Sequence, residues 1–389
     1  MVSKLKLKKQ DDIFQNVKRC TKCVLPETFP GISYNEEGIC NYCLEWKPVS
    51  VLGELKLNSI LDSVKNKGDR YDILVPFSGG RDSTFVLYEL VKKYSMRVLA
   101  ITVDSGFLTK EGYDNISRVS DCLNVDHVWL KDENKIKISK KNCITKFHGW
   151  LKNPSINTIV PVLNSGDKTM NLQMYKYAHQ HHIPLMTGGN IIGNSVFEHE
   201  HWKTGYLGVF PDNRGIYSTT DKIKLSFLFW KEYLSNSDNL KIPILTEYSK
   251  GAAVYFFESV LKPSDVDNFG FFDYIHWKEE EILTTIRHKA NWKGADDTET
   301  TWRIDDAAYP LINYIYWKLV GFTEHDEMYS KMIRDNQITR KEALNRLTED
   351  HTPRLNSIEE SLLELNVDKK SLDKVLDNYR KKLLRSILN

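Results

Sequence analysis

The chain has 389 residues, of which 41% are apolar and 27% charged, and its formal net charge is only +2. These values allow two or three domains with apolar cores and a soluble surface, and the near-neutral charge argues against binding to nucleic acid. No apolar run approaches the roughly 20 residues needed to span a bilayer. The N-terminal stretch also lacks the apolar core of a signal peptide. We therefore expect a cytoplasmic protein with no membrane partner, and nucleic acid is not an expected partner.

Four of the six cysteines form two CxxC pairs near the N-terminus, Cys20 with Cys23 and Cys40 with Cys43. Sixteen residues separate the pairs, which matches the spacing of a four-thiolate zinc ribbon. An iron–sulfur cluster is the lesser alternative, because four cysteines suit both groups. We expect residues 1–50 to form this metal-bound module, with a structural role because four thiolates leave no open coordination position.

Residues 51–68 have the apolar spacing of an amphipathic helix and open a predicted domain covering 51–250. An apolar strand over 71–77 then leads into Ser78-Gly79-Gly80-Arg81-Asp82-Ser83, and a helical pattern follows. Two glycines at the start of a helix let backbone N–H groups surround a phosphate. The segment lacks the Lys-Ser/Thr pair of a Walker A loop. It resembles the PP-loop, SGGxDS, of ATP pyrophosphatases, which cleave ATP between the α- and β-phosphates.

On this interpretation ATP is held by residues 77–83, that is by Phe77, Ser78, Gly79, Gly80, Arg81, Asp82 and Ser83. Asp82 is the expected carboxylate for Mg²⁺, which prefers a few carboxylate oxygens together with phosphates and water. A helix cap is an alternative role for Asp82, and both roles can coexist. Arg81 occupies the variable position of the motif and receives no catalytic role.

Strands alternate with helices beyond this loop, which predicts a parallel sheet with ligands at the carboxyl ends of its strands. Strands are predicted over 98–103, 127–130 and 184–187, and helices over about 111–123 and 168–182. Two further strand ends would then face ATP. The first contains Val103 and Asp104, and the second contains Gly188, Gly189 and Asn190. Glu198 and His199 follow the second end and are candidate substrate contacts.

From residue 251 to 389 the composition becomes helical and aromatic, and we expect this region to complete the active site. Its most informative segment is Trp302-Arg303-Ile304-Asp305-Asp306. Arg303 could hold a phosphate or carboxylate through two hydrogen bonds, and Asp305 or Asp306 could bind a metal or orient an amine. A buried Arg–Asp pair that only joins two domains is an equally open alternative. Residues 338–344 and 357–388 are predicted to form surface helices.

The cysteine ribbon, the SGGxDS loop, the Thr187-Gly188-Gly189-Asn190 loop and the Trp302–Asp306 segment together resemble the N-acetyl sugar amidotransferase family of O-antigen and surface-polysaccharide biosynthesis. The resemblance is most specific over 20–106 and 287–347. It implies an α/β PP-loop domain with an N-terminal zinc ribbon and a C-terminal helical region. It also implies that ATP activates the amide of a nucleotide-linked N-acetyl sugar and that ammonia converts it into an acetamidino group. By position, Asp82, Arg303, Asp305 and Asp306 would be catalytic, and Trp302 would contact substrate.

Ammonia must come from elsewhere, because the chain shows no glutamine-hydrolysing nucleophile. Residue 2 is Val, and Cys122 and Cys143 lack the flanking glycines of a nucleophile elbow. We expect a separate glutaminase subunit, from a glutaminase and cyclase-like pair. Two rival functions stay open: a tRNA sulfurtransferase, which would need a reactive cysteine near the PP-loop, and a non-enzymatic ATP-binding scaffold.

Overall fold

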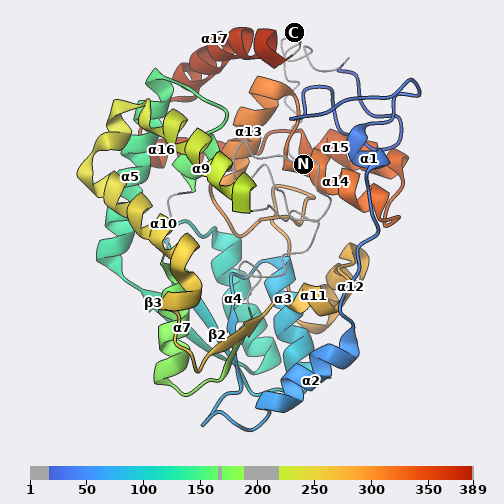
Figure 1. The fold of residues 1–389 in the computed structure, drawn as a ribbon, viewed down its shortest axis with the longest axis vertical. Helices are drawn as coiled ribbons and strands as arrows, with labels where there is room; N and C mark the ends of the chain where they lie inside the picture. The colour runs from blue at the N-terminus through green and yellow to red at the C-terminus, as the bar shows by residue number, and fades with distance from the viewer. Residues whose placement is uncertain (1–16, 165–168, 188–218, 388–389) are drawn as a thin grey trace.

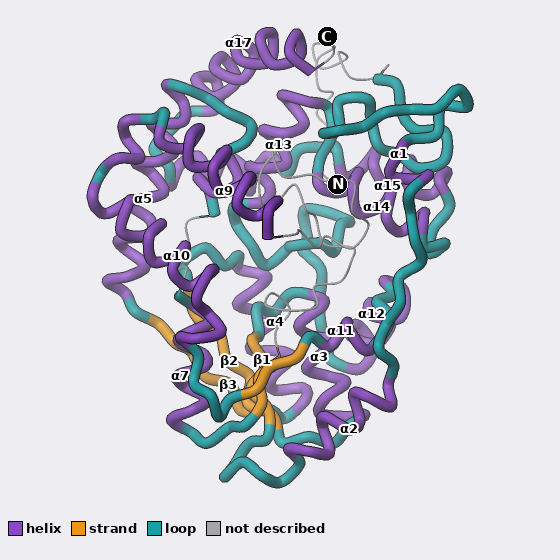
Figure 2. Tube along the Cα trace, in the orientation of Figure 1, coloured by secondary structure: helices purple, strands orange, loops and turns teal. Residues whose placement is uncertain are grey.

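The structure is a computed structural model that describes residues 17–164, 169–187 and 219–387. Its strands gather in one half of the molecule, and the other half is almost entirely helical (Figures 1 and 2). The chain passes between the two halves more than once, so both are built from segments that are distant in sequence.

A five-stranded parallel sheet has the order β3-β2-β1-β4-β5. The strands are β1 (Ile73–Pro76), β2 (Val98–Asp104), β3 (Asp126–Lys131), β4 (Leu185–Thr187) and β5 (Asp267–Phe269). In the register, Ile73 of β1 faces Val98 of β2 on one side and Leu185 of β4 on the other. The four strands predicted from the sequence are confirmed with shifts of one or two residues at their ends. The sequence analysis missed β5, since three residues of mixed polarity give no apolar run.

Helices cover both faces of the sheet, as expected when strands are buried on both sides. Alternate residues of β1 and β2 point to opposite faces. One face packs against α2 (Glu54–Val64), α3 (Arg81–Tyr88), α4 (Lys110–Leu123) and α12 (Glu279–Lys289). The other packs against α7 (Met170–Gln180). A π-helix, Glu89–Lys93, continues α3.

A second apolar core lies in the helical half. It joins the cysteine module and its helix α1 (Asn41–Leu44) to α5 (Glu133–Lys152), α6 (Ile159–Leu163), α13 (Tyr309–Val320), α16 (Leu355–Glu364) and α17 (Lys369–Ile387). The prediction of surface helices near the C-terminus was incomplete: α16 buries Ile358 and Leu362, and α17 buries Leu372 and Leu376. The remaining helices are α9 (Thr219–Leu234), a 3₁₀ turn (Ser237–Leu240), α10 (Ile242–Leu261), α11 (Phe271–Tyr274), α14 (Glu324–Arg334) and α15 (Arg340–Asp350).

The two cores do not follow the predicted division at residue 250. Helices α5 and α6 precede residue 250 but pack in the helical half, whereas β5 and α12 follow it and pack with the sheet. Among the described residues, no helix is both long enough and apolar enough to cross a bilayer.

Candidate active site at the phosphate loop

The PP-loop lies at the carboxyl end of β1, between β2 and β4. From β1 the chain adds β2 and β3 on one side of the sheet and later β4 and β5 on the other side. Open α/β sheets bind their ligands where the strand order reverses in this way. Helix α3 begins at Arg81 directly after the loop, with Gly80 as its N-cap. Its N-terminus therefore adds partial positive charge where a phosphate would lie.

Gly79 cannot be replaced by a larger residue without strain. Its φ is +76°, and a Cβ atom would lie 2.4 Å from the carbonyl oxygen of Gly112 at the start of α4. The indole N–H of Trp292 donates to the Gly79 carbonyl oxygen at 2.9 Å. The loop is thus held on one side by α4 and on the other by a tryptophan from beyond residue 250.

Gly80 is required for a different reason, because the carboxylate of Asp305 lies where its side chain would be. A Cβ atom on Gly80 would meet Oδ2 of Asp305 at 2.8 Å. The loop hydroxyls are close by: Ser78 and Ser83 oxygens lie 3.2 Å apart, and the Gly80 amide donates to Ser78 Oγ at 3.3 Å. The structure therefore brings a predicted catalytic carboxylate onto the predicted phosphate loop.

Asp305 reaches this position because its segment runs antiparallel to the loop that follows β2. Leu108 and Asp306 form a β-bridge. The Thr109 amide donates to the Asp305 carbonyl at 3.1 Å, and the Thr109 hydroxyl donates to the Ile304 carbonyl at 2.6 Å. The short ladder fixes the C-terminal region against the sheet.

The carboxylates near the loop repel one another and are partly removed from water. Burial raises the pKa of Asp305, and the charge of Asp82 raises it further. Burial also raises the pKa of Asp306 to about 6, with Asp305 adding to the effect. The Arg303 guanidinium acts in the opposite direction on both groups. Perturbed carboxyls of this kind are characteristic of functional sites, although ion-pair networks also produce them.

Asp82 is held at the first turn of α3 and remains one-third exposed. Its Oδ1 accepts from the indole N–H of Trp277 at 3.2 Å and from Arg81 Nε at 3.2 Å. Mg²⁺ bound with nucleotide phosphates needs only one or two protein carboxylates, and a partly exposed, oriented Asp82 fits that requirement. Asp305 is a second carboxylate at the same loop, beside Gly80.

Two side chains assigned to ATP binding point elsewhere. The Arg81 guanidinium is buried between the rings of Trp277 and Trp302 and donates to Glu279 at 2.7 Å and to Thr301 at 3.0 Å. The Phe77 ring is 2% exposed and belongs to the sheet core. Both side chains therefore pack inside the protein, where Phe77 continues the inward face of β1. A contact of their backbone with ATP stays a prediction.

Trp302 packs its ring against Arg81, and its indole N–H donates to Glu324 at 3.0 Å. Arg303 has a left-handed backbone with φ +48°, forms an ion pair with Glu324 at 3.2 Å and stacks on Tyr309 at 4.3 Å. This ion pair lies within the C-terminal region and does not join it to the sheet. The partner of Arg303 is Glu324, which the sequence analysis did not single out, rather than Asp305 or Asp306.

Val103 and Asp104 border a small pocket at the carboxyl ends of β2 and β3. The Asp104 carboxylate already accepts from the Gly106 amide at 2.8 Å and the Tyr113 hydroxyl at 3.0 Å. It therefore shapes the loop after β2. The other predicted contacts, Gly188, Gly189, Asn190, Glu198 and His199, lie outside the described residues.

Several functional neighbours were missed by the sequence analysis, namely Trp277, Trp292, Glu279 and Glu324. The tryptophans donate to the loop, and the glutamates bind Arg81 and Arg303. Nothing local in the sequence identifies these partners, since each lies at least 20 residues from its target.

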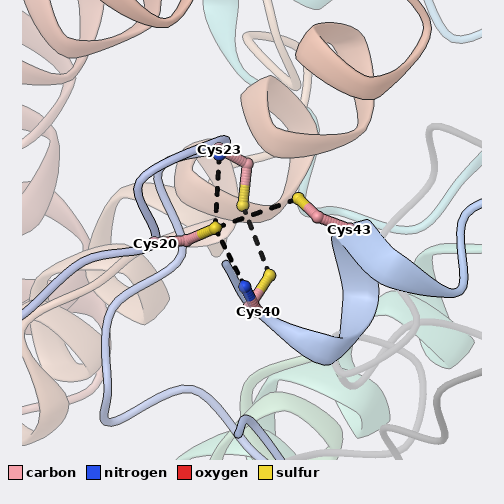
Figure 3. Close-up of side chains that lie close together, drawn as sticks. All are labelled: Cys20, Cys23, Cys40 and Cys43. Carbon is pink, nitrogen blue, oxygen red and sulfur yellow. Dashed lines mark hydrogen bonds between the residues drawn. The ribbon is translucent and has the colours of Figure 1, made fainter. Parts of the chain in front are cut away.

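The four predicted metal ligands converge on one point (Figure 3). Their sulfurs lie within 4.8 Å of one another, with Cys20–Cys43 at 3.9 Å and Cys23–Cys40 at 3.7 Å. Thiolates bound at about 2.3 Å to one tetrahedral ion would be roughly 3.8 Å apart. In a four-iron cluster each thiolate binds a different iron, which would spread the sulfurs farther. Within the described ranges, no other set of three or more His, Cys, Asp or Glu ligand atoms is this compact.

Backbone amides and a distant arginine support the cysteine turns. The amides of Cys23 and Cys40 point at Cys20 Sγ at 3.4 and 3.2 Å, an arrangement that favours a thiolate. Arg340 of α15 donates to the carbonyls of Cys20 and Cys23 at 3.1 and 2.9 Å. The module is thus anchored to the C-terminal region, away from the PP-loop (Figure 1).

The other cysteines do not face the loop. Cys143 is 3% exposed, and its sulfur faces the carbonyls of Val162 and Leu163. Cys122 is exposed near the C-terminus of α4, the end of that helix opposite the PP-loop, beside the Lys289 carbonyl.

Comparisons with known proteins show what the C-terminal region is similar to. Residues 300–385 match the model described as LPS biosynthesis protein WbpG-like, C-terminal domain. An uncharacterized protein of Methanocaldococcus jannaschii is 30% identical over 112 residues, which cover 28% of this chain and only 40% of that protein. Two solved structures align at low similarity. NMN synthetase from Francisella tularensis has 12% identity and a TM-score of 0.35, covering 78% of this chain and 93% of that one. The U34-tRNA thiolase NcsA from Methanococcus maripaludis, described with its [4Fe-4S] cluster, has 10% identity and a TM-score of 0.32, covering 90% and 89%.

The fold and the loop together define a PP-loop α/β protein with a four-cysteine module and a helical C-terminal region. The predicted fold class is confirmed. Residues 300–385 are similar to the C-terminal domain of WbpG-like LPS biosynthesis proteins, which supports the resemblance to the surface-polysaccharide family.

Proposed function

We propose that this protein is an ATP-dependent, AMP-forming amidotransferase of polysaccharide biosynthesis that acts on a nucleotide-linked N-acetyl sugar. The observation that carries the proposal is the contact between Asp305 and Gly80. It brings a carboxylate of the WbpG-like domain onto the phosphate loop of the sheet. A family-specific domain that only stabilised the fold would not need a carboxylate there.

The proposed reaction has two steps. The amide oxygen of the N-acetyl group attacks the α-phosphorus of ATP, and pyrophosphate leaves. Ammonia then attacks the activated carbon, and AMP departs with the former amide oxygen, leaving an acetamidino group. The amides of Gly79 and Gly80, the hydroxyls of Ser78 and Ser83 and the N-terminus of α3 would bind the departing pyrophosphate. Asp82 would hold Mg²⁺, which supplies charge neutralisation on the phosphates.

Asp305 and Asp306 would act on the nitrogen. A carboxyl whose pKa is near 6 is ionised at neutral pH but still basic enough to accept a proton efficiently. We propose that Asp306 is the general base that accepts the proton lost by ammonia as it attacks. Asp305, placed over the loop, would orient the ammonia and share the metal.

Zinc is the ion we propose for the cysteine module, because the sulfur spacing fits one tetrahedral ion. The ammonia source is proposed to be a separate glutaminase subunit. Among the described residues, neither Cys122 nor Cys143 faces the PP-loop, which also weighs against the sulfurtransferase alternative.

The test is to incubate the protein with ATP, MgCl₂, ammonium chloride and a panel of nucleotide-linked N-acetyl hexosamines labelled with ¹⁸O in the acetyl carbonyl. The expected products are pyrophosphate and AMP that carries the label. The Asp305→Asn variant is expected to bind ATP but form little AMP. Formation of ADP and orthophosphate, or of unlabelled AMP with an acceptor that is consumed, would contradict the proposal. A Cys122→Ser, Cys143→Ser double variant should keep full activity, and its inactivity would favour thiolation.

A further inference from the structure

The carboxylate of Asp82 is held through one of its two oxygens. Its Oδ1 accepts from the indole N–H of Trp277 at 3.2 Å and from Arg81 Nε at 3.2 Å. Neither bond uses Oδ2, and the side chain of Asp82 is one-third exposed at the first turn of α3. Two donors on one oxygen therefore set the direction in which the other oxygen points.

Trp277 is itself held in place, so its N–H is a fixed donor. The residue is 2% exposed, and its backbone carbonyl accepts from the side-chain amide of Gln337 at 2.9 Å. Its ring meets the ring of Trp302 edge-on, with 6.3 Å between the centroids. These two rings enclose the guanidinium of Arg81, which lies 5.0 Å from the first and 4.4 Å from the second.

A buried tryptophan needs an acceptor for its N–H in any case, so the contact could serve the fold alone. Two observations favour a role at Asp82. The acceptor is a carboxylate on the helix that opens at the phosphate loop, rather than a carbonyl inside the core. Arg81 Nε ends on the same oxygen, although the rest of its guanidinium is bound by Glu279 and Thr301.

Such an arrangement suits a carboxylate that binds a metal ion. Ligating carboxylates are usually hydrogen-bonded by neighbouring groups, and loss of such a partner commonly lowers metal affinity about 10- to 100-fold. A carboxylate that rotates freely must also lose this freedom when it binds an ion. The position of Asp82 is already fixed before any ion arrives.

We propose that Trp277 is a positioning residue for the magnesium carboxylate: its indole N–H holds Oδ1 of Asp82, which leaves Oδ2 to the ion. This inference rests on the proposed function, in which Asp82 holds Mg²⁺, and adds to it the residue that sets the affinity for that ion. Trp277 acts through Asp82 and not by touching the nucleotide.

The test compares Trp277→Phe with Trp302→Phe. Each change keeps an aromatic ring beside Arg81 and removes one indole N–H, and both parent residues are buried. Trp302 is the matched control, because its N–H donates to Glu324 and not to Asp82. The two variants therefore lose similar volume at the same arginine and differ in whether Asp82 loses a donor.

The first readout is binding of α,β-methylene-ATP, which cannot be cleaved between its α- and β-phosphates. MgCl₂ is titrated into the protein and the analogue, in buffers freed of metal by a chelating resin so that the cysteine site is not stripped. Trp277→Phe should raise the apparent dissociation constant for Mg²⁺ about tenfold. Its affinity for the analogue without Mg²⁺ should change by less than about twofold, and Trp302→Phe should change the Mg²⁺ constant by less than about twofold.

Turnover gives a second readout. In AMP formation Trp277→Phe should raise the apparent constant for Mg²⁺ by the same factor, whereas kcat at saturating MgCl₂ should fall less than about threefold. An unchanged Mg²⁺ constant in Trp277→Phe would overturn the inference. An equal rise in Trp302→Phe would also overturn it, because the effect would then come from packing around Arg81.

A measurement on the parent protein does not depend on how the variants fold. In ¹⁵N-labelled protein with α,β-methylene-ATP bound, addition of MgCl₂ should shift the indole N–H signal of Trp277. No shift of that signal would contradict the inference. A parent protein that binds the analogue equally well with and without MgCl₂, or that forms no AMP with any acceptor, would count against the proposed function instead, so the two failures can be distinguished.

Discussion

Replacing Gly80 by Ala should damage catalysis while leaving the fold intact. The φ of Gly80 is −72°, which any residue adopts without strain. The new methyl group would, however, lie 2.8 Å from Asp305 Oδ2 and 3.0 Å from its Cγ. Non-bonded carbon contacts are most favourable at about 3.5–4.0 Å, so the carboxylate must move by roughly 0.5–1 Å.

The size of the effect follows from that displacement. A reacting group misplaced by about 1 Å can cost on the order of 100-fold in rate. The stability cost should be small, about 1 kcal/mol or less, because the displaced atoms are the end of a side chain rather than backbone. For a protein of this length that corresponds to less than roughly 4 °C in Tm.

The assay is AMP and pyrophosphate release under saturating ATP, measured for Gly80→Ala in two backgrounds, the parent and Asp305→Ala. If the methyl group acts by displacing Asp305, it should reduce kcat about 100-fold in the parent but less than about threefold once Asp305 is Ala, because groups in contact are not additive. Equal losses in the two backgrounds would refute the reasoning. Gly79→Ala is the contrasting control. Its Cβ would lie 2.4 Å from the backbone oxygen of Gly112 at φ +76°, so it should lower Tm in both backgrounds.

Three other perturbations have expected outcomes. Arg81→Ala removes a buried guanidinium that binds Glu279 at 2.7 Å and Thr301 at 3.0 Å, and should lower the free energy of unfolding by about 3 kcal/mol; a loss below roughly 1 kcal/mol in urea titrations would contradict the structural role of this residue. The pKa of Asp306 is raised by burial to about 6, so the parent loses stability as the pH rises from about 4 to 6. Asp306→Asn should therefore be more stable than the parent at pH 8, by up to about 3 kcal/mol, and equal to it near pH 3; melting curves that stay parallel across this range would exclude the shift. Cys23→Ser should reduce bound zinc from one ion per chain to none and lower Tm, as measured by metal analysis and calorimetry; full metal retention would mean that the ion is held elsewhere.

The features that could be predicted from the sequence depend on neighbouring residues. The PP-loop needs a strand, two glycines and a helix in immediate succession, and all of them occur between residues 71 and 91. The cysteine site likewise depends on two short turns, since each CxxC pair places two sulfurs on one side. Parallel strands such as β2 were recognisable because they are buried on both faces and form continuous apolar runs.

The features that could not be predicted depend on contacts between distant segments. Arg81 occupies the variable position of its motif, yet it is fixed by Glu279, nearly 200 residues away. The indole donors to the loop, Trp277 and Trp292, are similarly remote. A sequence shows that a tryptophan is present, but not which carbonyl or carboxylate its N–H will reach. The same holds for β5, which is a strand only because β4 offers it an edge.

These distant contacts explain why the C-terminal region cannot be an independent appendage. The sheet supplies the loop that would bind ATP, but three residues from beyond 270 contact it. Trp292 donates to the Gly79 carbonyl, Trp277 donates to the Asp82 carboxylate, and Asp305 lies beside Gly80. We therefore expect the loop to be inactive without the region that contacts it. On the proposed function, Asp305 acts both at the phosphate loop and on the nitrogen that attacks the acceptor, so we expect AMP formation without an acceptor to be much slower than with one.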